Sequence, residues 1–287
     1  MNRKVKIIEC PRDAMQGIKS HFIATEDKAK YINSLLRVGF DTIDFGSFVS
    51  PKAIPQMRDT AAVLSKLDLQ NTASKLLAIV ANVRGAEDAS VFDEIDYLGF
   101  PFSISENFQM RNTGKTIAES FIALDTILNI AVKTNKKVVA YLSMGFGNPY
   151  GDIWNVDIVA NYTEKLAKMG VKILSLSDTI GVADGKTISY LFANLIPLYP
   201  KIEFGAHLHT TPSTWHEKVA AAYQAGCNRF DGAIKGFGGC PMAKDELTGN
   251  MPTEKLLSYF TQQKADIGIK PMAFESAYNA ALDVFYN

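Results

Sequence analysis

The segment from Lys137 to Asp178 reads KVVAYLSMGFGNPYGDIWNVDIVANYTEKLAKMGVKILSLSD and is the part of the chain that says most about its fold. Two short runs rich in β-branched and aliphatic residues, Lys137–Met144 and Lys172–Asp178, flank an amphipathic stretch at Trp154–Lys168. Runs of this length are typical of buried strands, and the stretch between them has the apolar spacing of a helix. The segment therefore predicts a strand–helix–strand unit, in which the crossover helix makes the two strands parallel.

The same alternation extends along the chain in both directions. The predicted strands are Val5–Cys10, Thr42–Gly46, Lys75–Ala81, Tyr97–Ile104, Lys137–Met144, Lys172–Asp178, Glu203–His209 and Arg229–Lys235. Further helical patterns lie between them at Ala24–Val38, with Thr25 as the N-cap, at Thr113–Lys133 and at Ser213–Ala225.

Eight strand–helix units in roughly 260 residues favour an α/β fold, the (β/α)8 or TIM barrel. A doubly wound open sheet is the alternative, but no glycine-rich phosphate-binding motif follows the first strand. We expect a single TIM-barrel catalytic domain over residues 1–287, with the barrel at about 5–265. Lys255–Gln263 and Phe274–Tyr286 are also helical in pattern. The second predicts an extra C-terminal helix at about 274–286, on the outside of the barrel.

The composition narrows the class of protein. Thirty Lys and Arg residues balance 30 Asp and Glu residues, so the chain lacks the basic excess of a nucleic-acid-binding protein. No window reaches ~18 uninterrupted apolar residues, and the N-terminus lacks the apolar core of a signal peptide. The three cysteines, an odd number, suit a reducing compartment. We therefore expect a cytoplasmic protein with neither nucleic-acid nor membrane partners.

In a barrel of this type the active site lies at the C-terminal ends of the strands. His207-Leu208-His209 ends one predicted strand, and residues two apart on a strand point to the same face. Both imidazoles can therefore bind one cation at the mouth of the barrel. The alternative is a pair of hydrogen-bonded structural histidines.

Further metal ligands are expected from the neighbouring strands. Asp13 follows the first strand, Asn250 lies in the loop after the last one, and strands 1, 7 and 8 are neighbours in a closed barrel. Two imidazoles, a carboxylate and an amide oxygen suit Mg²⁺ or Mn²⁺, whereas Zn²⁺ and Co²⁺ are chemically possible. Alternatively, Asp13 caps a loop or forms a salt bridge with Arg12.

A glycine-rich loop follows the last predicted strand and reads KGFGGCP at residues 235–241. Its glycines favour positive φ angles and a lid that moves over bound substrate. Such a lid would bring the thiol of Cys240 to the substrate as an acid/base group. The alternative is a plain turn in which Cys240 is a small apolar residue. Cys10 and Cys227 lie in apolar stretches and are expected in the core.

Taken together, these motifs resemble those of the hydroxymethylglutaryl-CoA lyase family of metal-dependent TIM-barrel lyases and aldolases. The resemblance covers about Val5 to Lys255, and its motifs are Pro11–Gln16, Ser47–Met57, Ser177–Gly181, Ala206–His209 and Gly236–Pro241 with Gly249-Asn250. It implies cleavage of 3-hydroxy-3-methylglutaryl-CoA to acetoacetate and acetyl-CoA. It also implies an acyl-CoA substrate, and we further expect a homodimer acting in ketone-body formation or leucine catabolism.

The resemblance also implies roles for individual residues. The implied metal ligands are Asp13, His207, His209 and Asn250. Arg12 would stabilise the enolate of the thioester, and Cys240 would be the acid/base group. If Cys240 does not supply the proton, the alternative catalytic source is His207 or a metal-bound water. The implied substrate-binding residues are Gln16, Lys19, Ser47, Tyr141 and Asp178.

Several positions depart from the family pattern. They are Cys10 and Ala14 in place of glycines, Glu9 one residue closer to the Arg-Asp pair than is usual, Asp44 in place of Glu, Thr210 in place of Asp, and one additional residue in Met242–Thr248. These departures concern the pocket, so the alternatives are a condensing relative such as a citramalate or isopropylmalate synthase, and a 4-hydroxy-2-oxoacid aldolase. A barrel that binds metal and coenzyme A without turnover is the non-enzymatic alternative.

Overall fold

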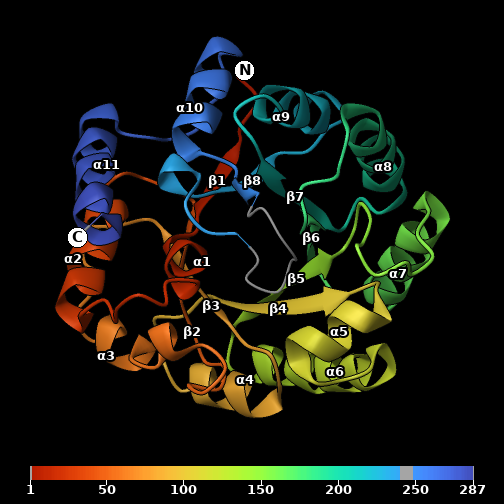
Figure 1. Ribbon diagram of the computed structural model, residues 1–287, viewed down its shortest axis with the longest axis horizontal. Coiled ribbons are helices and arrows are strands. Elements are labelled where there is room, and N and C mark those ends of the chain that lie inside the picture. Colours follow the sequence, from red (N-terminus) through yellow and green to blue (C-terminus); the bar gives the residue numbers. More distant parts are fainter. Residues whose placement is uncertain (1, 240–247, 287) are drawn as a thin grey trace.

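The computed structural model describes residues 2–239 and 248–286, and its centre is a closed barrel of parallel strands (Figure 1). The parallel strands found in these ranges are β1 (Lys6–Glu9), β2 (Thr42–Ser47), β3 (Lys75–Ile79), β4 (Tyr97–Ser103), β5 (Lys137–Ser143), β6 (Ile173–Asp178), β7 (Glu203–Thr210) and β8 (Arg229–Gly232). Each pairs with the next along the chain, and β8 pairs with β1, which closes the barrel. The predicted TIM barrel and its eight strands are confirmed.

The helices found in the described ranges are α1 (Pro11–Gln16), α2 (Thr25–Leu36), α3 (Thr60–Leu64), α4 (Val83–Ser90), α5 (Glu106–Thr113), α6 (Ile117–Lys133), α7 (Val156–Lys168), α8 (Gly185–Leu198), α9 (Trp215–Gln224), α10 (Thr253–Gln262) and α11 (Pro271–Phe285), with short 3₁₀ turns at Pro55–Met57 and Ile234–Gly236. Most of the helices form a ring around the barrel, whereas α1 lies at its mouth (Figure 1), and residues of α1 and α5 line the cavity there. The predicted C-terminal helix is α11, which packs against α2 on the outside. None of the helices in the described ranges is long and apolar enough to cross a membrane.

The starts of α2 and α6 differ from the sequence-based prediction for reasons that the structure shows. Ala24, not Thr25, is the N-cap of α2, because the Thr25 hydroxyl donates a hydrogen bond to Asp59 (2.7 Å) instead of capping the helix. The helix predicted from Thr113 begins at Ile117, where Thr116 and Glu119 form a capping box. Thr113 instead ends α5.

Side chains from β3, β4, β5 and β6 fill the interior of the barrel. The residues of this inner cluster are Leu77, Tyr97, Val139, Tyr141 and Ile173. A larger apolar core lies between the strands and the helices, and Cys10 and Cys227 are buried, as expected. Because side chains fill the barrel interior, a small ligand is expected at the C-terminal ends of the strands.

A short strand that the sequence did not predict, β9 (Gly249–Asn250), pairs with β7 in the antiparallel direction. In this register Asn250 lies opposite His209, and Gly249 lies opposite Thr210. Two residues are too few to give an alternating pattern, so the pairing was not visible in the sequence. The pairing brings the amide of Asn250 to the mouth of the barrel.

Glu9, at the end of β1, connects the first strand to the chain that follows β8. Its carboxylate is fully buried and accepts hydrogen bonds from the Ile234 backbone N–H (2.9 Å) and the Thr253 hydroxyl (2.6 Å). Burial raises the pKa of Glu9 to about 8, although both hydrogen bonds oppose the rise. The folded protein therefore holds a proton on Glu9 at pH values where the unfolded chain does not.

This raised pKa predicts a pH-dependent stability. Between pH 4.5, the ordinary pKa of the carboxyl, and about 8, the folded state binds more protons than the unfolded state, so stability falls as the pH rises. Each unit of pKa difference corresponds to about 1.4 kcal/mol. We expect Glu9→Gln, which stays neutral, to lose less stability than the wild type between pH 5 and 8.5 in urea unfolding. An equal loss in both proteins would contradict the assigned pKa.

Candidate active site and metal centre

The mouth of the barrel brings together three side chains that can bind a metal. His207 and His209 lie on β7, two residues apart, so both point to the same face of the strand. Asp13 lies on α1, which begins at Pro11 directly after β1 because a proline suits the first turn of a helix. One ligand atom from each of these three residues lies within 4.8 Å of the other two.

Asp13 carries a buried negative charge that its neighbours stabilise. Its carboxylate accepts hydrogen bonds from Arg12 Nη1 (3.0 Å), Gln16 Nε2 (2.5 Å) and Asn250 Nδ2 (2.8 Å). Burial alone would raise the pKa of Asp13, but the charges of Arg12 and the two histidines and the hydrogen bond from Asn250 bring it below its ordinary value. Asp13 is therefore ionised at neutral pH and could offer an anionic oxygen to a metal ion.

The two histidines differ in their surroundings. Burial, together with repulsion from His207, lowers the pKa of His209 to about 3, so His209 is neutral and has a free lone pair. Burial also opposes the charged form of His207, but the hydrogen bond from its Nδ1 to Asp231 (3.0 Å) raises its pKa. A carboxylate and two imidazoles fit a divalent cation that accepts mixed oxygen and nitrogen ligands.

Asn250 lies beside this cluster with its amide nitrogen toward Asp13. The same nitrogen donates to the backbone carbonyl of Phe237 (2.9 Å). Coordination through the amide oxygen therefore requires the amide to turn over. The nearby Gly238 has a φ of +88°, and a Cβ there would lie 2.7 Å from the Asp13 carbonyl oxygen. Only glycine lets the loop after β8 pass so close to α1.

Arg12 lies between two carboxylates at the edge of the cluster. Its Nε donates to both oxygens of Asp44 (3.2 and 3.1 Å), its Nη2 also donates to Asp44, and its Nη1 reaches Asp13 (3.0 Å). Burial works against the charge of Arg12, but these carboxylates outweigh burial and raise its pKa. The guanidinium is therefore always charged and is held in one orientation at the mouth of the barrel.

A cavity of about 140 Å³ opens over these residues. Its lining is Arg12, Asp13, Gln16, Ile79, Pro101, Phe108, Asn112, Tyr141, Ser143, Ser177, Thr179, His207 and His209. A second groove of about 410 Å³ shares Gln16 with the first, and its lining is Gln16, Gly17, Ile18, Lys19, His21, Phe22, Ala53, Ile54, Pro55, Gln56 and Arg58. Gln16 thus lies where a small inner cavity adjoins a larger outer groove.

Not every expected substrate residue lines the inner cavity. Gln16 and Tyr141 do, and Lys19 lines the outer groove. Ser47 donates to the backbone carbonyl of Ile79 (3.3 Å) and lines neither space. Asp178 is buried in an ion pair with Lys218 (2.6 Å), away from both spaces. Cys240 lies outside the described residues.

Three charged residues that support the site were not recognised as such from the sequence. Lys218 pairs with Asp178 and also donates to the backbone carbonyl of His209 (2.8 Å), which supports the end of β7 from behind. Asp44 holds Arg12, and Asp231 holds His207. The sequence offered one clue to the two acidic residues, because each lies within a predicted apolar strand. Asp44 lies in the strand predicted at residues 42–46 and Asp231 in the strand predicted at residues 229–235.

Comparisons of the sequence and of the structure with known proteins match the same family. A family model described as HMGL-like matches residues 4–280. The chain is 35% identical to the hydroxymethylglutaryl-CoA lyase of Bacillus subtilis, over 93% of this chain and 89% of that protein. It is 30% identical to the 3-hydroxy-3-isohexenylglutaryl-CoA/hydroxymethylglutaryl-CoA lyase of Pseudomonas aeruginosa, over 96% and 91% of the two chains. An HMG-CoA lyase structure from Acinetobacter baumannii, in complex with coenzyme A and 3-methylmalate, matches with a TM-score of 0.90 and 28% identity, over 98% of this chain and 91% of that one.

The cluster predicts one divalent cation site per chain. Calorimetric titration of chelator-treated protein with Mn²⁺ should show one site, and His207→Ala with His209→Ala should abolish it because two of the ligands are lost. The matched control is His21→Ala with His216→Ala, since both of these histidines are exposed and lie outside the cluster. Wild-type affinity in the His207/His209 double variant would show that the cation binds elsewhere.

Proposed function

The chain belongs to the HMGL-like family, and on this premise we propose that it is a hydroxymethylglutaryl-CoA lyase, which cleaves 3-hydroxy-3-methylglutaryl-CoA to acetoacetate and acetyl-CoA. The observation that carries the proposal is the position of Arg12. A permanently charged guanidinium adjoins the cluster of Asp13, His207 and His209 within one small cavity. Cleavage of a carbon–carbon bond next to a thioester needs both a means to activate a hydroxyl and a positive charge to stabilise an enolate.

Asp13, His207 and His209 would hold the metal, together with Asn250 once its amide has turned over. When bound, a divalent cation would polarise the substrate oxygens and make the tertiary hydroxyl more acidic. The anionic Asp13 and the oxygen of Asn250 favour Mg²⁺ or Mn²⁺. The residues of the chain prepare this site, since Arg12 and Gln16 already direct hydrogen bonds at the Asp13 carboxylate.

The reaction moves one proton and breaks one carbon–carbon bond. The tertiary hydroxyl on C3 would pass its proton to the thiolate form of the proposed acid/base group, Cys240, while the C2–C3 electron pair passes to the thioester and C3 becomes the ketone of acetoacetate. The departing fragment is the enolate of acetyl-CoA, and the guanidinium of Arg12 would stabilise its oxygen in the buried cavity. C2 then takes up a proton, for which the thiol of Cys240 is the proposed donor.

The two adjoining spaces suggest how an acyl-CoA would bind. The inner cavity is small and partly apolar, with Ile79, Pro101 and Phe108 in its lining, which suits a short branched acyl group. The outer groove contains Lys19 and Arg58, whose positive charges suit the phosphates of coenzyme A. Gln16 marks the passage between them, where the thioester would lie.

The cellular setting follows from the same proposal. Cys10 and Cys227 are free and buried, which suits a cytoplasmic, reducing environment. Release of acetoacetate would place the reaction in ketone-body formation or leucine catabolism. We also propose that the described barrel and its C-terminal helix act as one catalytic domain, and that the protein is a homodimer.

The proposed function predicts a specific pattern of turnover. With Mg²⁺ present, the wild type should release acetyl-CoA and acetoacetate from 3-hydroxy-3-methylglutaryl-CoA. It should turn over 3-hydroxy-3-isohexenylglutaryl-CoA poorly, because the inner cavity is small. Arg12→Lys should keep its thermal midpoint and Mn²⁺ binding, but lose kcat by about 10²–10³, because a point charge does not replace the planar fork.

The control for this variant is Arg84→Lys, which changes an exposed arginine on α4 and should leave kcat unchanged. Coupled detection of acetyl-CoA measures all of these reactions. A wild type that releases no acetyl-CoA from this substrate, yet condenses acetyl-CoA with a 2-oxo acid, would contradict the proposal and favour a condensing relative. A near-normal kcat in Arg12→Lys would show that Arg12 does not stabilise the enolate.

A further inference from the structure

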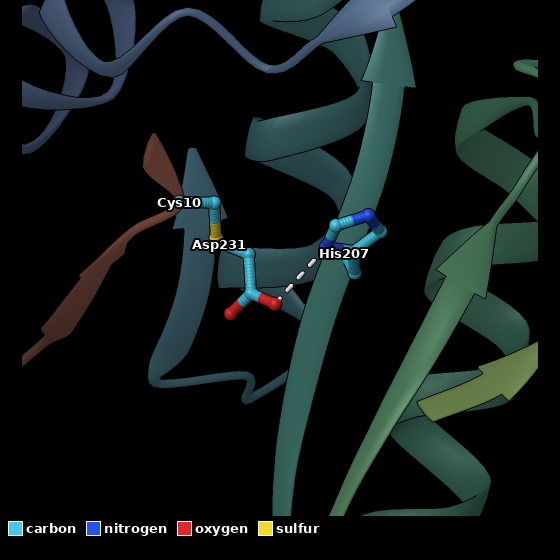
Figure 2. Close-up of side chains that lie close together, drawn as sticks. All are labelled: Cys10, His207 and Asp231. Carbon is cyan, nitrogen blue, oxygen red and sulfur yellow. Dashed lines mark hydrogen bonds and ion pairs between the residues drawn. The ribbon is translucent and has the colours of Figure 1, made fainter. Parts of the chain in front are cut away.

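The inner side of His207, away from the cavity, faces an acidic residue on the neighbouring strand. His207 on β7 and Asp231 on β8 are direct partners in the parallel register. Figure 2 shows the carboxylate of Asp231 between Cys10 and His207, with a hydrogen bond drawn to the imidazole. The bond joins His207 Nδ1 and Asp231 Oδ2 over 3.0 Å. The pairing is therefore set by the barrel itself and not by a mobile loop.

The two ends of the imidazole lie in different surroundings. The Asp231 side chain is 2% exposed, whereas that of His207 is 15% exposed and lines the inner cavity. Asp231 accepts the Nδ1 hydrogen bond on the closed side of the ring. Nε2 is then the nitrogen left for the cluster with Asp13 and His209.

We propose that Asp231 is a positioning residue, which holds His207 as the tautomer with its proton on Nδ1 and so keeps the Nε2 lone pair toward the metal site. An ionised carboxylate can only accept a hydrogen bond, so a neutral His207 must place its proton on the nitrogen that faces Asp231. Carboxylates that fix a ligand histidine in this way raise its basicity as well as its order. This inference rests on the proposed metal site.

The surroundings of Asp231 leave it free to act on His207. Within the described residues, its other oxygen, Oδ1, is buried and accepts no hydrogen bond, so His207 is the hydrogen-bond partner of this carboxylate found there. The buried guanidinium of Arg229 attracts the Asp231 charge without donating a hydrogen bond to it. Cys10 lies against the same carboxylate, but burial raises the pKa of its thiol, so it adds no second negative charge.

His209 has no comparable support. In the described part of the chain its ring forms no side-chain hydrogen bond, and Lys218 contacts only its backbone carbonyl. His207 is therefore the metal ligand with a preset orientation. With the metal bound, Nδ1 of His207 would be hydrogen-bonded to Asp231 and Nε2 would face the metal. His207 would then act as a ligand and have no nitrogen left to carry a proton. Proton delivery would fall to another group, such as the thiol of Cys240.

The experiment compares Asp231→Asn with Cys10→Ala. The first keeps the shape of the side chain but removes its charge and its obligatory acceptor role. The second changes a residue packed against the same carboxylate without touching the hydrogen bond to His207. Two readouts are used, the ¹⁵N spectrum of histidine-labelled, metal-free protein, assigned with His207→Ala, and the affinity for Mn²⁺ by calorimetry.

We expect the wild type and Cys10→Ala to show His207 protonated on Nδ1 and to bind Mn²⁺ within twofold of each other. Asp231→Asn should show a mixture of tautomers and a Mn²⁺ affinity about 10–100-fold lower, at an unchanged thermal midpoint. A folded Asp231→Asn with wild-type tautomer and affinity would overturn the inference. So would a wild type whose neutral His207, observed at a pH above its raised pKa, carries its proton on Nε2, a result that needs no variant to fold. If the wild type binds no Mn²⁺, the metal proposal fails, whereas the tautomer still decides the role of Asp231.

Discussion

The site depends on one buried negative charge, the carboxylate of Asp13, and on the neighbours that keep it ionised. A lone carboxylate in such a place would take up a proton, because burial without a partner costs several kcal/mol. Arg12 and Gln16 donate hydrogen bonds to it from the same helix, α1. The pKa of Asp13 is consequently below its ordinary value. With the neutral His209 beside it, the site offers one carboxylate oxygen and one imidazole nitrogen, both of which are suitable ligands for a divalent cation.

The barrel explains how distant parts of the chain meet around this charge. Parallel strands end on the same side, so α1 after β1 and the histidines on β7 lie at one mouth. The short strand β9 adds Asn250 opposite His209, and the positive φ of Gly238 lets the connecting loop pass against α1. The same closure places Asp231 of β8 beside His207, on the side of the imidazole that faces away from the cavity. The site is thus built mainly on strands and helix starts, which hold ligands more precisely than long loops do.

The sequence predicted the barrel because each strand is a short apolar run between two helical patterns. This alternation of strand and helix patterns can be seen in the sequence alone. It also predicted that Asp13 and the two histidines of β7 lie close together, because polar residues at strand ends stand out against apolar neighbours, and in the folded chain their ligand atoms do lie within 4.8 Å of one another. It could not predict β9, which is two residues long, or the direction in which Ser47 and Asp178 point. A single charged residue within an apolar strand indicates that its side chain needs a hydrogen-bond or ion-pair partner, but the sequence does not show which residue that partner is. For that reason the pairs of Asp44 with Arg12, Asp231 with His207 and Asp178 with Lys218 became visible only in the folded chain.

The central claim is that one divalent cation binds between Asp13, His207 and His209. Diffraction from crystals soaked in Mn²⁺, recorded where manganese scatters anomalously, tests it most directly. The account predicts one anomalous peak per chain, at about 2.0–2.3 Å from an Asp13 oxygen and from one nitrogen of each histidine. Cys10, His207 and Asp231 form a second group whose ligand atoms lie within 4.8 Å of one another. A peak at that group on the inner side of His207, or the absence of a peak at Asp13, would contradict the account.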